Sequence, residues 1–389
     1  MSQDAPKTPW WNDQGNRAIL YQVLVVGAVV LVGWYLISNT LANLAARNIA
    51  TGFGFLGREA GFAIGESPIA FDPADSYAKA ILVGLLNTLI VAVLGVALST
   101  VIGTIVGIAR LSGNWLVARL ATLYVETLRN IPVLLQLLFW YALITEGLPA
   151  ARQAFNPLPG VFLSNRGLKL PTPDWGGTEW AVLAALLLAV LGAVMLARWA
   201  RRRQAETGQS FPSVRAGLGL ILGLPLLVWL LGGAPVAMQV PELKGFNFEG
   251  GTTVSPEFAA LLTGLTLYTA SFIAEIVRSG ILAVSPGQTE AALALGLKRG
   301  QVLRLVVLPQ ALRVIIPPLT SQYLNLTKNS SLAVAIGYPD LVSVGNTTIN
   351  QTGQAIEGVA LLMAVYLAVS LGISVFMNWY DKKTALVGR

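Results

Sequence analysis

The 389-residue chain is 54% hydrophobic and 12% charged, with a mean hydropathy of +0.65, whereas soluble domains are about a quarter charged. It contains no Cys and no His, which excludes disulfide frameworks, Cys/His zinc sites and imidazole general bases. It also has no GxxxxGK[ST] motif for nucleotide phosphates, so any ATP-driven step requires a partner. This composition predicts an integral membrane protein.

About eight segments are long and apolar enough to cross a membrane, since a transmembrane helix needs roughly 20 such residues. We expect helices, because isolated strands cannot pair their backbone groups in lipid, and hence an all-α fold. The second and third segments have charged residues within and between them, so the alternative there is one long helix, a turn and a tilted helix. In chain order the eight segments are 19–38, 80–109, 117–144, 178–198, 214–232, 257–278, 305–326 and 356–378.

The first apolar segment follows basic residues, as a signal peptide does. It is longer than the 7–15 residues, roughly, of a signal-peptide core, and Asp4 and Asp13 lie before it, so we interpret it as an uncleaved anchor. The predicted organisation has four parts. These are an anchor and outer loop over 1–79, a first core part over 80–145, outer loops with two further helices over 146–256, and a second core part over 257–389.

The distribution of Lys and Arg predicts the orientation. If the N-terminus is cytosolic, seventeen of the 26 basic residues lie inside and eight outside, with Arg129 unassigned. This bias agrees with the excess of Lys and Arg in cytoplasmic loops. Both termini and the loop over 285–309 are therefore predicted to be cytosolic. The net charge of +7 reflects this topological bias, so the expected partner is the lipid bilayer and not a nucleic acid.

The loop over 285–309 has the pattern of a short helical hairpin. Ser285 and Gln288 have the spacing of a capping box, and Pro286 suits the first helical position. Gly296 can end this helix, and a second short helix should run from about Lys298. A carboxylate beside two alanines, at Glu290 to Ala292, would let another protein approach the first helix closely while the charge orients it.

This loop resembles the EAA loop of ABC importer permeases, with Glu-Ala-Ala, then Gly296, then Leu308-Pro309 at the family's spacing. Only the isoleucine of that pattern is replaced, by Val306. In that family the loop helices sit in a groove of the ATPase subunit, so the resemblance implies ATPase docking here. The alternative is an ordinary amphipathic connector. The residues assigned to docking are Glu290, Ala291, Ala292, Gly296, Lys298 and Arg299.

Longer stretches, over 80–145 and 257–383, resemble the core segments of polar amino-acid ABC permeases such as histidine and glutamine importers. The extra N-terminal helix and the insertion between about 146 and 256 make the layout similar to the permease of the general L-amino-acid importers. The resemblance implies a type I ABC importer permease core that moves amino acids by alternating access. It implies no catalytic residues, metal site or cofactor in this chain.

The same resemblance implies partners. They are an ABC ATPase dimer that binds ATP and Mg²⁺, an extracytoplasmic amino-acid-binding protein, and a second related permease. For the enlarged branch we expect a heterodimer of permeases rather than a homodimer, in the inner membrane. A secondary, ion-coupled amino-acid transporter is the alternative, although the chain has no intramembrane Asp or His for a proton relay. A membrane enzyme is a third class, and it lacks a nucleophile with a base.

An amino-acid path requires donors and acceptors inside the membrane, where an unpaired charge is costly. Two Glu-x-x-Arg pairs have a spacing that allows each pair to be neutralised internally, so each is either an ion pair near the inner face, structural or gating, or a substrate contact. For Thr88 the alternative is a bond back to its own helix. The candidates for path or gate are Asn87, Thr88, Glu126, Arg129, Gln136, Glu275, Arg278, Asn325, Lys328, Asn329, Ser330 and Ser331.

The polar cluster from Asn325 to Ser331 follows Pro317 and Pro318, which we expect to break the helix. Irregular backbone is tolerated in a membrane where it lines a cavity, so this cluster either lines a pocket or closes an outer gate. The spacing of Gly103 and Gly107 is typical of packed helices but also arises by chance in Gly-rich membrane chains.

Overall fold

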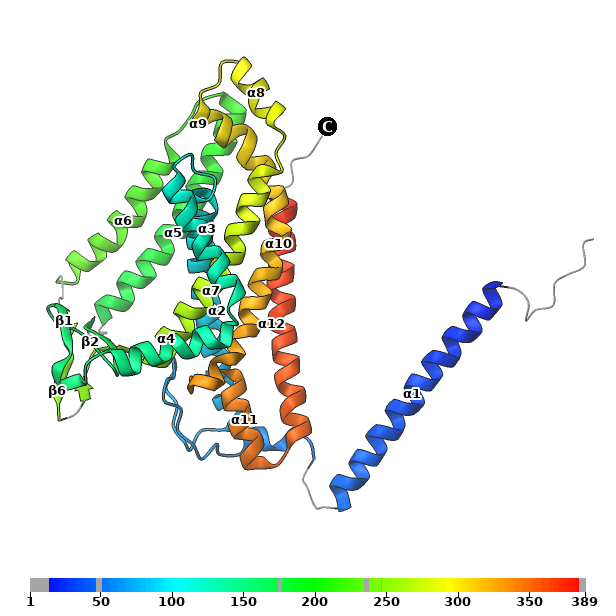
Figure 1. The fold of residues 1–389 in the computed structure, drawn as a ribbon. Coiled ribbons are helices and arrows are strands. Elements are labelled where there is room, and N and C mark those ends of the chain that lie inside the picture. The colour runs from blue at the N-terminus through cyan, green and yellow to red at the C-terminus, as the bar shows by residue number, and fades with distance from the viewer. Residues whose placement is uncertain (1–13, 47–50, 174–176, 234–237, 246, 385–389) are drawn as a thin grey trace, which may run out of the picture. The chain divides into compact units, whose positions relative to one another are not determined.

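The computed structural model describes residues 14–46, 51–173, 177–233, 238–245 and 247–384, and most of them are helical (Figure 1). The expectations for the leader and for the two chain ends lie outside these residues. The long helices are α1 (Gln14–Ala46), α2 (Tyr77–Ala109), α3 (Trp115–Asn130), α4 (Val133–Gly147), α5 (Gly177–Thr207), α6 (Ser213–Leu231), α7 (Pro256–Leu282), α10 (Leu308–Asn329), α11 (Leu341–Thr352) and α12 (Ala355–Thr384), with the short α8 (Pro286–Ala294) and α9 (Arg299–Val302).

Seven helices of the described residues are long and apolar enough to cross a membrane, and α3 with α4 forms an eighth span if the bent pair is counted as one. The single helix expected over 117–144 is wrong, because the chain bends by 106° between α3 and α4. Pro132 lacks an N–H and disfavours helical geometry at the residue before it. Ile131 is accordingly extended, with φ −98° and ψ 128°. The alternative of a long helix, a turn and a further helix fits α2 and α3 better.

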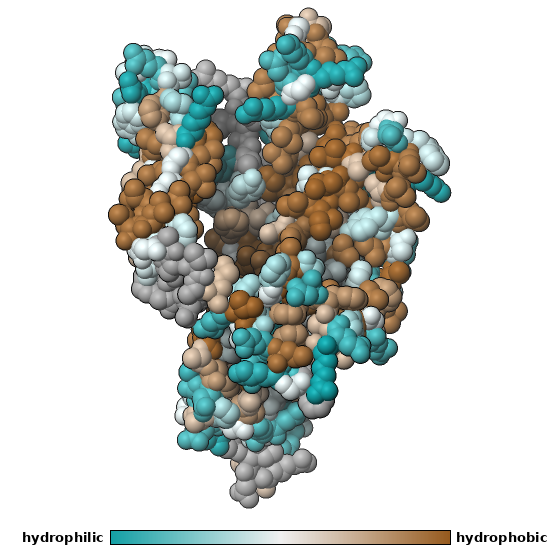
Figure 2. Space-filling model, turned by 90° about the vertical axis from the view of Figure 1, so that its left-hand side faces the viewer, coloured by the Kyte–Doolittle hydropathy of each residue, from teal (hydrophilic) through white to brown (hydrophobic). Residues whose placement is uncertain are grey.

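Apolar side chains remain exposed along most of the spanning helices. Leu187 and Leu191 of α5, Leu222 of α6, and Leu367 and Leu371 of α12 are all exposed. Figure 2 shows broad hydrophobic areas of this kind next to hydrophilic ones. Such contiguous apolar surface is the expected exterior of helices that lie in lipid.

Short strands form before α5 and after α6, within the part over 146–256 where outer loops are expected. One sheet has the antiparallel order β1-β2-β3-β8, with Leu168 opposite Val254, and two small pairs join β4 to β5 and β6 to β7. Strands of two to four residues are too short for a recognisable alternating pattern. Their bounds are β1 (Phe155–Leu158), β2 (Val161–Ser164), β3 (Gly167–Leu170), β4 (Thr172–Pro173), β5 (Met238–Gln239), β6 (Glu242–Lys244), β7 (Asn247–Glu249) and β8 (Thr252–Val254).

The chain divides into two compact units, here called unit 1 (residues 1–93 and 279–389) and unit 2 (residues 94–278). In unit 2, α2 and α7 approach closely at two glycines. A Cβ on Gly103 would lie 2.7 Å from the side chain of Ile273, and one on Gly107 would lie 2.6 Å from the carbonyl oxygen of Ala274. The small-residue spacing of α2 therefore does pack helices, because larger side chains would separate the two backbones.

Unit 1 has an aromatic core beside the start of α2. Phe55 and Tyr77 are buried, and Val344 of α11 packs with them. Helix α11 is absent from the predicted elements, because its sequence, LVSVGNTTINQT, is too polar and too short for a membrane span.

Helix α10 continues through Pro317 and Pro318, so the break expected there is wrong. The irregular backbone lies instead at its two ends. A π-helical turn (η4, Leu303–Val307) precedes it, and a 3₁₀ helix (η5, Ser330–Ile336) follows. The polar cluster over 325–331 thus straddles the end of a regular helix.

Candidate functional site

Helix α8 begins where the sequence predicts. Pro286 is its first residue, since its fixed φ suits that position and its missing N–H would be unpaired there in any case. The capping box is wrong, because the Ser285 side chain makes no capping bond. Instead the Gln288 N–H donates to the Ser285 carbonyl oxygen at 3.0 Å.

Gly296 ends this helix through a left-handed conformation, as predicted, with φ +82°. Its N–H donates to the Leu293 carbonyl oxygen at 2.9 Å, and the Leu297 N–H donates to that of Ala292 at 3.2 Å. These two bonds form a Schellman motif, which satisfies the last carbonyls of the helix. No atom lies within 4 Å of a Cβ built on Gly296, so the backbone angle, not space, favours glycine.

The second helix of the hairpin begins at Arg299, next to the predicted start at Lys298. The Lys298 N–H donates to the Gln301 side-chain oxygen at 2.9 Å, which satisfies one backbone group at the start of this helix. Both basic side chains are exposed. The turn between α8 and α9 is therefore held by local hydrogen bonds, from the backbone at Gly296 and Leu297 and from the Gln301 side chain.

The outward face of α8 combines charge with small and apolar side chains. Glu290 and Ala291 are exposed, whereas Ala292 is buried. Glu290 takes part in none of the ion pairs between described residues. Leu295, at the tip, is 83% exposed. An exposed apolar side chain and a carboxylate without an ion-pair partner among the described residues, carried on one short hairpin, are suited to contact with another protein.

A second cluster joins α2 and α7 at their predicted cytosolic ends, within unit 2. Glu275 forms an ion pair with Arg278 at 2.6 Å, one turn along the same helix, and a further ion pair with Arg110. The Arg110 side chain is 11% exposed and that of Glu275 26% exposed. One carboxylate thus bridges two guanidinium groups in a partly buried position.

Internal neutralisation holds for Glu275 and Arg278 but is wrong for Glu126 and Arg129. The Glu126 carboxylate lies 4.0 Å from Arg110, not against Arg129, and is 58% exposed. The Arg129 guanidinium lies 5.0 Å from the ring centroid of Phe272, in a cation–π arrangement. Arg110 is not among the predicted site residues, because each glutamate already has an arginine three residues along and no spacing points to a further partner 165 positions away.

Gln136 is buried at the bend between α3 and α4. Its Nε2 donates to the carbonyl oxygens of Leu128 and Ile131, each at 2.9 Å. These carbonyls lie at the end of α3, where no intrahelical N–H follows. The Nε2 of the side chain therefore stabilises the bend, whereas its Oε1 is buried without a hydrogen-bond partner in the described residues.

Asn87 and Thr88 hold the turn that follows η5, within unit 1. The Asn87 Nδ2 donates to the carbonyl oxygens of Glu66 and Pro339, each at 2.9 Å. The Leu341 N–H donates to the Thr88 Oγ1 at 3.1 Å, so this hydroxyl bonds to another segment. Both residues fix the start of α11 against α2.

The polar cluster from Asn325 to Ser331 divides by exposure. Asn325 and Lys328 are exposed, and Asn329 is half-buried. The Ser330 and Ser331 hydroxyls, at the start of η5, each donate at 2.7 Å to a carbonyl oxygen three residues earlier, in the last turn of α10. The Asn325, Lys328 and Asn329 side chains are not held by a bond of this kind, so they are the more open candidates for a ligand or gate.

Residues 205–386 match the family described as "Binding-protein-dependent transport system inner membrane component". The chain is 54% identical over 379 residues to the general L-amino acid transport system permease protein AapQ of Rhizobium johnstonii, covering 97% of this chain and 94% of that protein. It is 51% identical to the putative amino-acid ABC transporter permease protein YhdX of Escherichia coli, covering 96% and 95%. It is 42% identical to BztB of Rhodobacter capsulatus, a glutamate/glutamine/aspartate/asparagine transport system permease protein, covering 97% and 96%.

Proposed function

Because the chain belongs to the family of binding-protein-dependent inner-membrane permeases of amino-acid ABC transporters, we propose that it is a membrane-spanning subunit of an ABC importer that carries amino acids across the cytoplasmic membrane. The helical hairpin of α8 and α9 carries this proposal, since it is the exposed element through which an ATPase could push on the spanning helices. The ion-coupled alternative is not favoured, because the relatives are named as permeases of ABC transport systems.

The proposed importer requires three kinds of partner, which deliver the amino acid, hydrolyse ATP and complete the path across the membrane. A binding protein delivers the amino acid from outside, and an ATPase dimer binds ATP and Mg²⁺ and closes against Glu290, Ala291 and Gly296. The neighbouring Lys298 and Arg299 add charge to the same contact. We propose that the second permease is a related but different chain, so that the path lies between the halves of a heterodimer. The open side chains of Asn325, Lys328 and Asn329 are the candidates of α10 for that path or its gate.

We expect amino-acid uptake by the assembled complex to require hydrolysable ATP. The complex, co-purified through a tag on this chain, would be reconstituted with its binding protein and labelled L-glutamate or L-alanine. Uptake would be compared with ATP, with a non-hydrolysable analogue, and with an ion gradient alone. Equal uptake with the gradient alone would contradict the proposal.

The proposed orientation places both termini and the hairpin in the cytosol, and single cysteines can test it because the chain has no Cys. Cysteines at the exposed positions Gln204 and Gln301 should react with a membrane-impermeant maleimide only after the membrane is opened. Those at the exposed positions Ala63 and Glu242 should react in intact spheroplasts. Reaction of the Gln301 position from outside would separate the hairpin from cytosolic ATP and contradict the orientation.

A further inference from the structure

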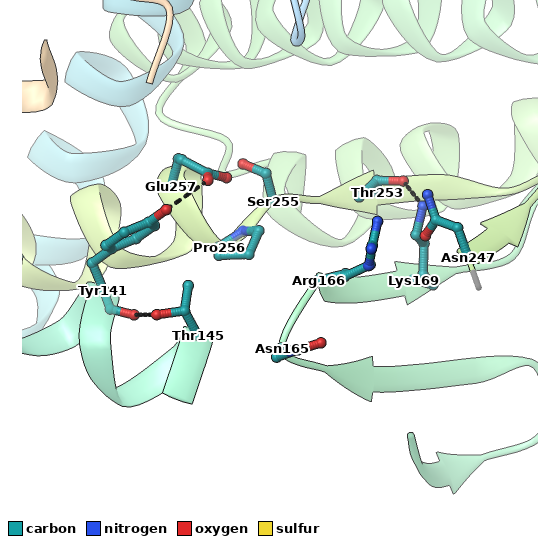
Figure 3. A pocket seen from close by; sticks show the side chains of 10 residues that line it. All are labelled: Tyr141, Thr145, Asn165, Arg166, Lys169, Asn247, Thr253, Ser255, Pro256 and Glu257. Atoms are coloured by element: carbon teal, nitrogen blue, oxygen red, sulfur yellow. Dashed lines mark hydrogen bonds between the residues drawn. The ribbon is translucent and has the colours of Figure 1, made fainter. Parts of the chain in front are cut away.

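An open cavity of about 370 Å³ lies in unit 2 among residues of the four-stranded sheet, the end of α4 and the start of α7 (Figure 3). Its volume is within the range of about 300–1,000 Å³ that is usual for small-molecule sites. Most of its lining belongs to the inserted segment over 146–256. This segment contains neither the α8–α9 hairpin nor the ion pairs of Glu275, so it has no role in the sites described above. The polarity of the lining indicates what such a cavity would accept.

One end of the cavity is basic. Lys169 of β3 is 7% exposed, and its Nζ donates to Thr253 Oγ1 at 2.5 Å. Burial, and then the nearby Arg166, lower the pKa of Lys169. Neither cation has a carboxylate partner among the ion pairs of the described residues. A buried cation without an anion is costly, and an ammonium group has three donors, of which Thr253 takes one.

The other end offers acceptors. Glu257, in the first turn of α7, accepts a hydrogen bond from the Tyr141 hydroxyl at 3.1 Å and has further lone pairs free for a ligand. Figure 3 shows this pair at the opposite end of the cavity from Arg166 and Lys169. Between them, the Asn165 Oδ1 is buried without a hydrogen-bond partner in the described residues. The cavity thus presents donors for an anion at one end and acceptors for a donor group at the other.

We propose that this cavity is a binding site for a small organic carboxylate that also carries a hydrogen-bond donor. Arg166 and Lys169 hold the carboxylate, and Asn165 and Glu257 receive the donor group. An amino acid has both groups, so the assignment of amino acids as the ligand class rests on the proposed transport function. The site lies on the predicted outer side, where it would hold the amino acid before the membrane is crossed.

Equilibrium binding of labelled L-glutamate and L-glutamine to the purified complex, without binding protein and without ATP, tests this site. We expect Lys169→Met and the exposed Arg166→Gln each to weaken binding about tenfold, which is the loss of one charge-assisted hydrogen bond. Lys244→Met is the matched control, because Lys244 is an exposed cation that forms an ion pair with Glu249 at 2.9 Å and does not line the cavity. It should leave binding unchanged.

Two results would overturn the site. One is that the unmodified complex does not bind the labelled amino acids at millimolar concentration. The other is that all three variants bind them as tightly as the unmodified complex does. If Lys169→Met and Arg166→Gln lower only the affinity for the binding protein, the cavity receives an acidic side chain of that protein and the small-molecule assignment is wrong. ATP-driven uptake by the same preparation is measured separately. Normal uptake without cavity binding therefore refutes this site while leaving the transport function intact.

Discussion

Gly296→Val should reduce ATP-driven uptake by about tenfold or more while the complex still inserts into the membrane. A β-branched residue is strongly disfavoured at φ +82°, at a cost of about 1–2 kcal/mol in the left-handed region. The Schellman bonds from Gly296 and Leu297 would be lost or displaced, which changes the angle between α8 and α9. A change of 1.4 kcal/mol in docking corresponds to about tenfold in affinity. Uptake and ATPase activity in proteoliposomes measure the coupling.

Two variants make this prediction specific. Gly300→Val is the matched control, because Gly300 lies in α9 with ordinary φ and has no atom within 4 Å of a built Cβ. It should retain most of the uptake. Gly296→Asn should also retain more uptake than Gly296→Val, since Asn tolerates the left-handed region. Equal uptake by the two valine variants would show that the turn geometry is not required.

Reversal of charge on the same hairpin separates docking from folding. Glu290→Lys should lower the amount of ATPase that co-purifies, because Glu290 is exposed and has no ion-pair partner among the described residues whose loss would disturb the fold. Unchanged recovery of the ATPase with Glu290→Lys would move the docking contact elsewhere on the hairpin.

Glu275→Gln should destabilise the complex by about 1–3 kcal/mol and reduce its transport accordingly. The carboxylate forms ion pairs with both Arg110 and Arg278, and its removal leaves two cations together in a partly buried position. Loss of one partner of a buried pair costs about 3–5 kcal/mol. The estimate here is smaller because the Glu275 side chain is 26% exposed. The thermal midpoint of the purified complex measures the effect.

Glu126→Gln is the matched control, because its carboxylate is 58% exposed and lies 4.0 Å from Arg110. We expect a change of at most about 0.5 kcal/mol. The double variant Arg110→Met with Glu275→Met should be less destabilised than the sum of its single variants, since it leaves no uncompensated partner at that contact. Strict additivity would contradict the ion pair between Arg110 and Glu275.

The residue types in the sequence were sufficient to predict where the first helix of the hairpin begins and ends. Pro286 begins α8 and Gly296 ends it because each residue has one strong backbone preference, which acts without help from distant segments. Two other predictions from local residue types were wrong, the capping box at Ser285 and the helix break at Pro317. Ser285 has the residue type of a capping box without its bond, and Pro317 lies inside α10 although proline usually interrupts a helix.

The positions of the apolar segments and the excess of inside Lys and Arg determined the helical membrane class and the predicted orientation of this chain, because length and hydropathy are sums over the sequence that need no contacts. Which polar side chains contact one another was decided only by the tertiary structure. Glu275 meets Arg110 across 165 positions, and the Lys169 ammonium meets Thr253 across 84. No spacing rule joins residues that far apart. Their proximity follows from the approach of α2 to α7 at Gly103 and Gly107, and from the pairing of β3 with β8.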